Sequence, residues 1–142
     1  MRTRSLNHST YEIQCHIVWG TKCRRRWLKD CVKRGLVASF KSTVKKYPTL
    51  HMVAVNTDQD HVRLQIEIPP NTAVADAVRE LKASSSARLR RTLKFIRRIC
   101  LEKDGIWSVG YFVSSLGLDD GRIKKYIEWQ GKRELPQTAK LF

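Results

Sequence analysis

The sequence predicts an α+β domain in which helices cover an antiparallel sheet, and three observations lead to this prediction. Residues 11–19 and 61–68 alternate apolar and polar side chains, which is the period of a strand with one buried face. Apolar residues recur at helical spacing in residues 28–46 and again after residue 72. Finally, the 142 residues contain no linker and no internal repeat, so they suit one domain, residues 1–142, with a tail from about residue 132.

The first predicted strand, residues 11–19, leads into a basic turn and then a helix. The strand carries apolar side chains on one face, from Tyr11 to Trp19, and polar ones on the other. The turn, residues 20–26, concentrates cations that suit either solvent or phosphate: Lys22, Arg24, Arg25 and Arg26. The helix, residues 28–46, is predicted to end before Pro48, because proline disfavours helical geometry in the residue that precedes it.

A hairpin follows, made of strands at residues 50–56 and 61–68 that a polar turn joins. In the second strand the apolar side chains face the core: Val62, Leu64, Ile66 and Ile68. The opposite face presents four polar groups: His61, Arg63, Gln65 and Glu67. Two prolines end the strand because proline cannot donate to the ladder.

The remaining elements are two helical segments that flank a fourth strand. Thr72 is expected to cap a helix that continues through the densest cationic segment of the chain: Arg88, Arg90, Arg91, Lys94, Arg97 and Arg98. A polar break at residues 102–105 precedes a strand at residues 107–116. Asp119 or Asp120 then caps a last helix, on which Tyr126 and Gln130 lie one turn apart on one face.

This order of elements matches the split βαβ pattern, a ferredoxin-like or RRM-like antiparallel sheet, with one extra C-terminal helix that carries Tyr126. Many functions share that fold, so the fold alone selects none of them.

Charge narrows the choice of partner. Lys and Arg number 28 against 13 acids, a formal net charge of +15, which favours nucleic acid first and an anionic membrane surface second. No apolar run approaches the ~20 residues that span a bilayer, and the N-terminus does not read as a signal peptide. The four cysteines form no CxxC pair, so we expect reduced thiols in a cytoplasmic protein.

Several short segments, in order and spacing, carry a resemblance to a known family. They are His16-Ile17-Val18-Trp19, Asp60-His61-Val62, Leu81-Lys82, Gly110-Tyr111-Phe112-Val113-Ser114, and Lys125-Tyr126-Ile127-Glu128 with Gln130. Together they resemble the single-tyrosine HUH transposases of the insertion-sequence-200/605 class, which include TnpA-like and REP-associated tyrosine transposases. The resemblance covers residues 6–130.

The resemblance implies a mechanism. Such enzymes cut and rejoin hairpin-forming single-stranded DNA through a 5′-phosphotyrosine, with Mg²⁺ or Mn²⁺ held by two histidines and a helical Gln or Glu. They are homodimers whose composite sites can combine one subunit's tyrosine helix with the other's histidine strand. Carried over, the nucleophile is Tyr126 and the metal ligands include His61 and Gln130. A phenol titrates near ~10, so it needs a nearby cation to attack at neutral pH.

One departure from the family's pattern concerns the second histidine, whose position holds Arg63. Arginine has no lone pair to donate to a metal. Three interpretations follow. The first and preferred one is a nuclease that is impaired but retains its DNA surface. In the second, Arg63 clamps the scissile phosphate. In the third, a neighbour completes a changed metal site: Asp60, Gln65 or Glu67.

The predicted DNA contacts come from the basic segments together with Arg63 and Lys82. The first alternative function is a non-catalytic, domesticated regulator that binds nucleic acid through the same surface. A more distant alternative is a generic RNA-binding domain, which would need aromatic side chains on the exposed sheet face, where His61 and Arg63 stand instead.

Overall fold

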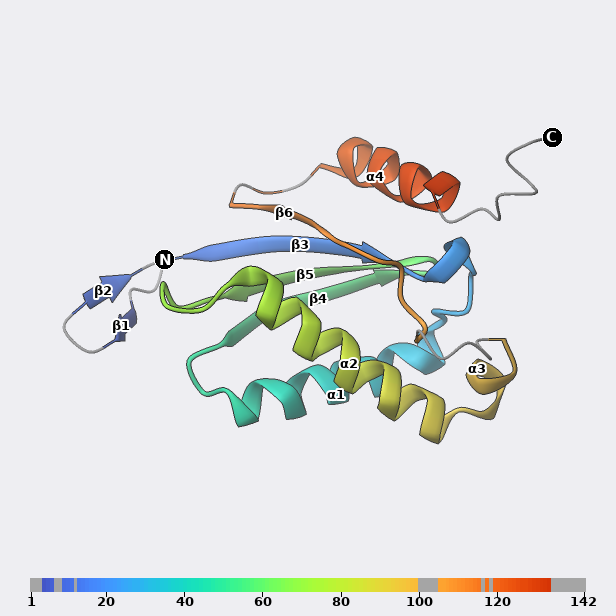
Figure 1. Ribbon diagram of the computed structural model, residues 1–142, viewed down its shortest axis with the longest axis horizontal. Helices are drawn as coiled ribbons and strands as arrows, with labels where there is room; N and C mark the ends of the chain where they lie inside the picture. The colour runs from blue at the N-terminus through green and yellow to red at the C-terminus, as the bar shows by residue number, and fades with distance from the viewer. Residues whose placement is uncertain are drawn as a thin grey trace.

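A four-stranded antiparallel sheet forms the centre of the computed structural model, which describes residues 4–6, 9–11, 13–99, 105–115, 117 and 119–133 (Figure 1). The strands are β3 (Gln14–Gly20), β4 (His51–Asp58), β5 (His61–Glu67) and β6 (Phe112–Ser114), and their order in the sheet is β4-β5-β3-β6. A separate hairpin pairs β1 (Arg4–Leu6) with β2 (Ser9–Tyr11). The sheet order and its antiparallel pairs confirm the predicted ferredoxin-like α+β fold.

Two helices, α1 (Asp30–Lys46) and α2 (Val74–Thr92), cover one face of the sheet (Figure 1). The four apolar side chains of the 61–68 stretch are buried there, as predicted, against the apolar stripes of both helices. The helices approach closely at Gly35, where an added Cβ would lie 3.2 Å from Cδ2 of Leu89. A glycine that weakens the isolated helix therefore allows the two helices to pack.

The last helix, α4 (Asp120–Arg133), covers the opposite face of the sheet (Figure 1). Its Ile123 and Ile127 pack with Val18, which is 1% exposed although alternation assigned it to the polar side of its strand. The prediction that Asp119 caps this helix is confirmed, because its carboxylate accepts a hydrogen bond of 2.7 Å from the backbone N–H of Arg122.

Several predicted boundaries were wrong. The basic helix is broken at Leu93, which is extended (φ −120°, ψ 105°) between α2 and α3 (Lys94–Ile99). The residue before α2 is Ala73, so Thr72 does not cap it. Within the described part of the strand predicted at residues 107–116, which leaves out residue 116, the ladder to β3 is confined to Phe112–Ser114. Tyr11 belongs to β2.

The shortened fourth strand has a physical reason. Trp107 makes an isolated bridge to Thr21, and Gly110 adopts φ +90°, which an extended strand cannot accommodate. The predicted break at residues 102–105, except Gly105, and the tail from residue 134 lie outside the described residues.

None of the described helices has both the length and the hydrophobicity needed to cross a membrane. The three described cysteines, Cys15, Cys23 and Cys31, are free thiols, and burial raises the pKa of Cys15.

Candidate functional site

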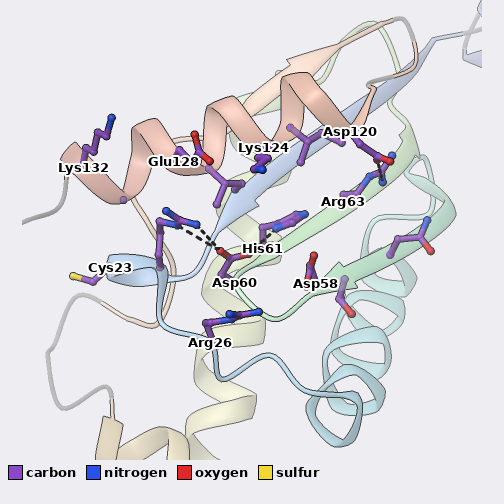
Figure 2. Close-up of a pocket in the computed structure, with 16 residues that line it drawn as sticks. Cys23, Arg26, Asp58, Asp60, His61, Arg63, Asp120, Lys124, Glu128 and Lys132 are labelled. Atoms are coloured by element: carbon purple, nitrogen blue, oxygen red, sulfur yellow. Dashed lines mark hydrogen bonds and ion pairs between the residues drawn. The ribbon is translucent and has the colours of Figure 1, made fainter.

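A cavity of about 990 Å³ lies between α4, the adjoining ends of β4 and β5, and the short helix η1 (Lys22–Arg24) (Figure 2). Five cations line it: Arg24, Arg26, Arg63, Lys124 and Lys132. His61 and four acids also line it: Asp58, Asp60, Asp120 and Glu128. The sheet and the last helix therefore bring together residues that are up to 109 positions apart, from Cys23 to Lys132.

His61 is held by Asp60, the residue that precedes it. Its ring nitrogen Nδ1 lies 2.8 Å from Oδ1 of Asp60, and the Arg24 guanidinium lies 3.5 Å from Oδ2 (Figure 2). The hydrogen bond with His61 is the largest cause that lowers the pKa of Asp60, with a contribution from Arg24 and against the opposing effect of burial. With Nδ1 occupied, the nitrogen that can serve a ligand or a proton is Nε2.

Arg63 lies in the same cavity and pairs with α4 (Figure 2). Its Nη1 donates to Oδ1 of Asp120 at 3.0 Å. The side chain of Asp120 is 92% exposed and that of Arg63 is 39% exposed, so such a pair contributes only ~0 to 1 kcal/mol to stability. The contact nevertheless joins the histidine strand to the first turn of the tyrosine helix.

Arg24 makes a second contact between this cavity and α4. Its side chain packs so closely on Gly131 that a Cβ at that position would overlap it. Cys23 and Arg24 both have positive φ angles, 57° and 55°, a conformation that side-chain-bearing residues seldom adopt. This backbone turn directs Arg24 toward both Gly131 and Asp60.

Tyr126 and Gln130 form a separate pair on another face of α4. The amide nitrogen Nε2 of Gln130 donates to the carbonyl of Val109 and to the Tyr126 hydroxyl, 2.8 Å away. Because a carbonyl can only accept, the bond to Val109 identifies Nε2 as the atom at this place. Gln130 is 2% exposed, and Gly110 lies so close that its Cβ would be 3.5 Å from Nε2.

The tyrosine pair and the histidine cavity are thus distinct within one chain. Neither Tyr126 nor Gln130 lines the cavity that holds His61. The Tyr126 ring instead packs against Phe112 of β6, with ring centroids 5.7 Å apart. Of the three predicted site residues, the structure brings two together and leaves the third, His61, with Arg63.

The donor set does not fit the metal that the resemblance implies. His61 is arranged as a ligand would be, since metal-binding imidazoles commonly have a carboxylate on their second nitrogen. Arg63 cannot ligate, and the Gln130 amide is turned to Tyr126 and Val109. Among the described residues, no group of three His, Cys, Asp or Glu side chains could hold a metal ion.

The proposed neighbours do not complete the set. Gln65 donates to Gln14 at 2.7 Å, and Glu67 is buried and accepts from Gln14 at 3.4 Å. Neither residue lines the His61 cavity, and Asp60 is occupied with His61 and Arg24.

Lys82 has a role that the sequence did not predict. Its ammonium donates to the carbonyls of Ser108 at 2.8 Å and of Gly110 at 2.6 Å, and it lies 5.9 Å from the centre of the Trp19 ring. The carbonyls of residues 108–110 therefore all accept hydrogen bonds from side chains of two helices. Lys82 of α2 binds those of residues 108 and 110, and Gln130 of α4 binds that of residue 109. No local pattern in the sequence could indicate bonds that span 21 to 28 residues.

The other predicted DNA contacts lie in two basic regions. One surrounds η1, where Arg24, Arg25 and Arg26 are exposed and Lys22 is half-buried. The other follows α2 into α3, with Arg88 and Arg90 half-buried and four exposed cations: Arg91, Lys94, Arg97 and Arg98.

Known proteins resemble this chain in sequence and in fold. A protein-family model described as "Transposase IS200 like" matches residues 9–130. The transposase for insertion sequence element IS200 from Salmonella typhimurium is 29% identical over 130 residues, which is 89% of this chain and 82% of the relative. The ISDra2 transposase TnpA of Deinococcus radiodurans is 26% identical over 125 residues, which is 87% of this chain and 88% of that relative.

Two solved structures are similar. A protein of Deinococcus radiodurans R1, provisionally named a transposase, superposes with a TM-score of 0.77 and 25% identity over 89% of this chain and 97% of that one. A REP-associated tyrosine transposase, solved bound to a REP hairpin, superposes with a TM-score of 0.53 and 13% identity over 89% of this chain and 70% of that one. The second likeness is one of fold.

Proposed function

The chain belongs to the IS200-like transposase family, and on that premise we propose that it binds hairpin-forming single-stranded DNA while its ability to cut that DNA is impaired. The carrying observation is Arg63. It stands two residues from His61, where the family places its second histidine, and its guanidinium is paired with Asp120. Compared with the family's pattern, the cavity therefore has one metal ligand fewer and a fixed positive charge in its place.

DNA binding is supported by charge. Five cations surround the His61 cavity, and six more follow α2 and α3, in a chain whose formal net charge is +15. A REP hairpin is also the ligand of one similar structure. Arginine and lysine clusters of this kind neutralise phosphates and release counterions, which makes binding tight at low salt.

Two alternatives start from the same site. In one, Arg63 clamps the scissile phosphate and partly replaces the metal, which its place in a cation-lined cavity favours. In the other, the chain is a domesticated regulator without catalysis. The mutual engagement of Tyr126 and Gln130, outside the His61 cavity, is compatible with that role.

The geometry also supports a homodimer. If Tyr126 is the nucleophile, it cannot act at its own chain's His61 as placed here, because α4 presents it on a different face. A second copy that supplies its tyrosine helix would resolve this separation, as composite sites do in the family.

The test uses the full chain and a hairpin-forming single strand of DNA. Fluorescence anisotropy measures the binding affinity, and incubation with Mn²⁺ followed by a denaturing gel measures the covalent protein–DNA adduct. We expect salt-sensitive binding with little covalent adduct, and Tyr126→Phe provides the blank for any tyrosine-linked band. Failure to bind any hairpin refutes the DNA proposal. Efficient adduct formation by the unmodified chain refutes impairment and favours the phosphate clamp.

A further inference from the structure

The carboxylate of Asp120 occupies a place in the His61 cavity that neither DNA binding nor DNA cleavage explains. Four acids line this cavity beside five cations, so with His61 counted as neutral its excess is one positive charge, in a chain whose formal net charge is +15. A surface that only attracts phosphates gains nothing from acids among its cations. Two of the acids are paired with cations of the cavity, Asp60 with Arg24 and Asp120 with Arg63 (Figure 2).

The two ion pairs differ in how easily the acid can leave its cation. The side chain of Asp60 is 16% exposed, and its second carboxylate oxygen is bonded to His61. The side chain of Asp120 is 92% exposed, and within the described part of the chain Arg63 is its one partner. Rotation of Asp120 away from Arg63 therefore places the carboxylate in water and breaks no other contact of that side chain. Asp120 is the acid that an incoming anion can displace.

The place that Asp120 takes on Arg63 suits a phosphate as well as a carboxylate. Nη1 of Arg63 donates to Oδ1 of Asp120 at 3.0 Å, a charge-assisted hydrogen bond. The planar guanidinium uses the same fork of N–H donors for carboxylate and for phosphate oxygens. While Asp120 is in place, one donor is taken and the negative charge beside it repels a phosphate from the others.

The last helix keeps this carboxylate at the cavity. Asp120 belongs to the first turn of α4, where an acid is favoured by the helix dipole, and the packing of Ile123 and Ile127 fixes α4 on the sheet. Lys124 lies one turn further along the same face of α4 and lines the same cavity. A phosphate that replaces the carboxylate at Arg63 therefore enters a place where a second cation is already present.

We propose that Asp120 is an intramolecular competitor for phosphate at Arg63. Its carboxylate occupies the guanidinium in the free chain, and a backbone phosphate of bound DNA displaces it. The inference rests on the proposed DNA-binding function and adds an autoinhibitory contact to the same site. Because the ion pair is exposed and weak, it lowers the affinity of the cavity for phosphate without closing it.

The test measures hairpin affinity by fluorescence anisotropy in a double-substitution cycle. Asp120→Asn should tighten binding roughly two- to ten-fold at low salt, because the ion pair no longer has to be broken and the repulsion of phosphate is removed. In an Arg63→Gln background the same substitution should lose most of this effect, since the competition has no target there. Asp30→Asn is the matched control, because it removes an exposed acid from the first turn of α1 and raises the net charge equally. It should change affinity by less than about two-fold.

A second measurement follows Arg63 itself. The NMR signal of its side-chain Nε–H group should respond to inorganic phosphate, and it should saturate at a lower phosphate concentration in Asp120→Asn than in the unmodified chain. The control Asp30→Asn should saturate as the unmodified chain does. A purely structural role of Asp120 would change stability without this shift in phosphate affinity.

The outcomes separate this proposal from the broader one. If Asp120→Asn and Asp30→Asn tighten hairpin binding equally, or if the effect of Asp120→Asn persists with Arg63→Gln, Asp120 acts through general charge and the competition is wrong, although DNA binding stands. If neither the unmodified chain nor Asp120→Asn binds a hairpin, the DNA proposal fails, and the phosphate titration of Arg63 decides the competition alone. Equal saturation in both chains would then overturn it.

Discussion

Replacing Lys82 with methionine tests whether this residue is structural rather than a phosphate contact. The change removes two charge-assisted hydrogen bonds, each worth ~1.5–3 kcal/mol net, and a cation–π contact with Trp19 worth ~0.5–1 kcal/mol. Two effects offset this loss. The ammonium no longer needs desolvation, and Gly110 is exposed, so water can reach its carbonyl. We therefore expect Lys82→Met to lower the free energy of unfolding by ~2–4 kcal/mol.

Urea denaturation of both variants measures this difference, and Lys41→Met, an exposed position in the middle of α1, is the control. The control should change stability by less than ~0.5 kcal/mol. Amide hydrogen exchange should also quicken in residues 108–110, because two of the three hydrogen bonds that hold the carbonyls of this segment, those of Ser108 and Gly110, are lost. If Lys82→Met is no less stable than Lys41→Met but binds hairpins more weakly, Lys82 is a phosphate contact and the structural role is wrong.

Four further predictions concern charge, pH, metal and assembly. Arg90→Glu combined with Arg91→Glu should weaken hairpin binding at every sequence and flatten its log–log salt dependence, whose slope is about −0.7 to −0.9 per phosphate neutralised; unchanged affinity would place the DNA surface elsewhere. Because the hydrogen bond with His61 lowers the pKa of Asp60 in the folded chain, that stabilisation is complete above the ordinary value of ~3.9 and is lost as pH falls through the lowered one. The stability gap between the unmodified chain and Asp60→Asn should therefore be fully present at neutral pH and narrow as pH falls below ~3.9, and a gap that is independent of pH would contradict this. Arg63→His should raise Mn²⁺ affinity in calorimetry, since residues 61 and 63 share one face of β5; if adduct formation falls instead, Arg63 is a working clamp. Light scattering should give about twice 16.5 kDa, and a monomer at all concentrations would count against a shared site.

The sheet was predictable because its pattern is local. Alternation identified β5 and the buried side chains from Val62 to Ile68, and helical spacing identified α1. The family resemblance depended on short segments in a fixed order, and the match to residues 9–130 confirms it. The periodicity and the family segments both depend on residues that are close together in the sequence, so both could be recognised without a structure.

The rest depended on contacts between distant segments. Val18 points to the face of its strand opposite the main core, yet α4 buries it. Its environment is therefore decided by Ile123, which is 105 residues further along the chain. The partner of Arg63 is Asp120, 57 residues further on, and nothing in the sequence around Arg63 indicates it. The fourth strand was predicted too long, because β propensity cannot foresee that Lys82 and Gln130 take the carbonyls of residues 108–110.

The arrangement around Arg63 separates two tasks that a metal would combine. A divalent cation both attracts phosphate and favours the phenolate that attacks it. Arginine performs the first task permanently, because its charge does not depend on a ligand set. It cannot perform the second task on the Tyr126 of its own chain, since that residue lies on another face of α4 and accepts a hydrogen bond from neutral Gln130. An arginine at the position of the family's second histidine should therefore preserve affinity for DNA while it removes cleavage. We expect substitutions of Arg63 to change DNA binding and DNA cleavage independently.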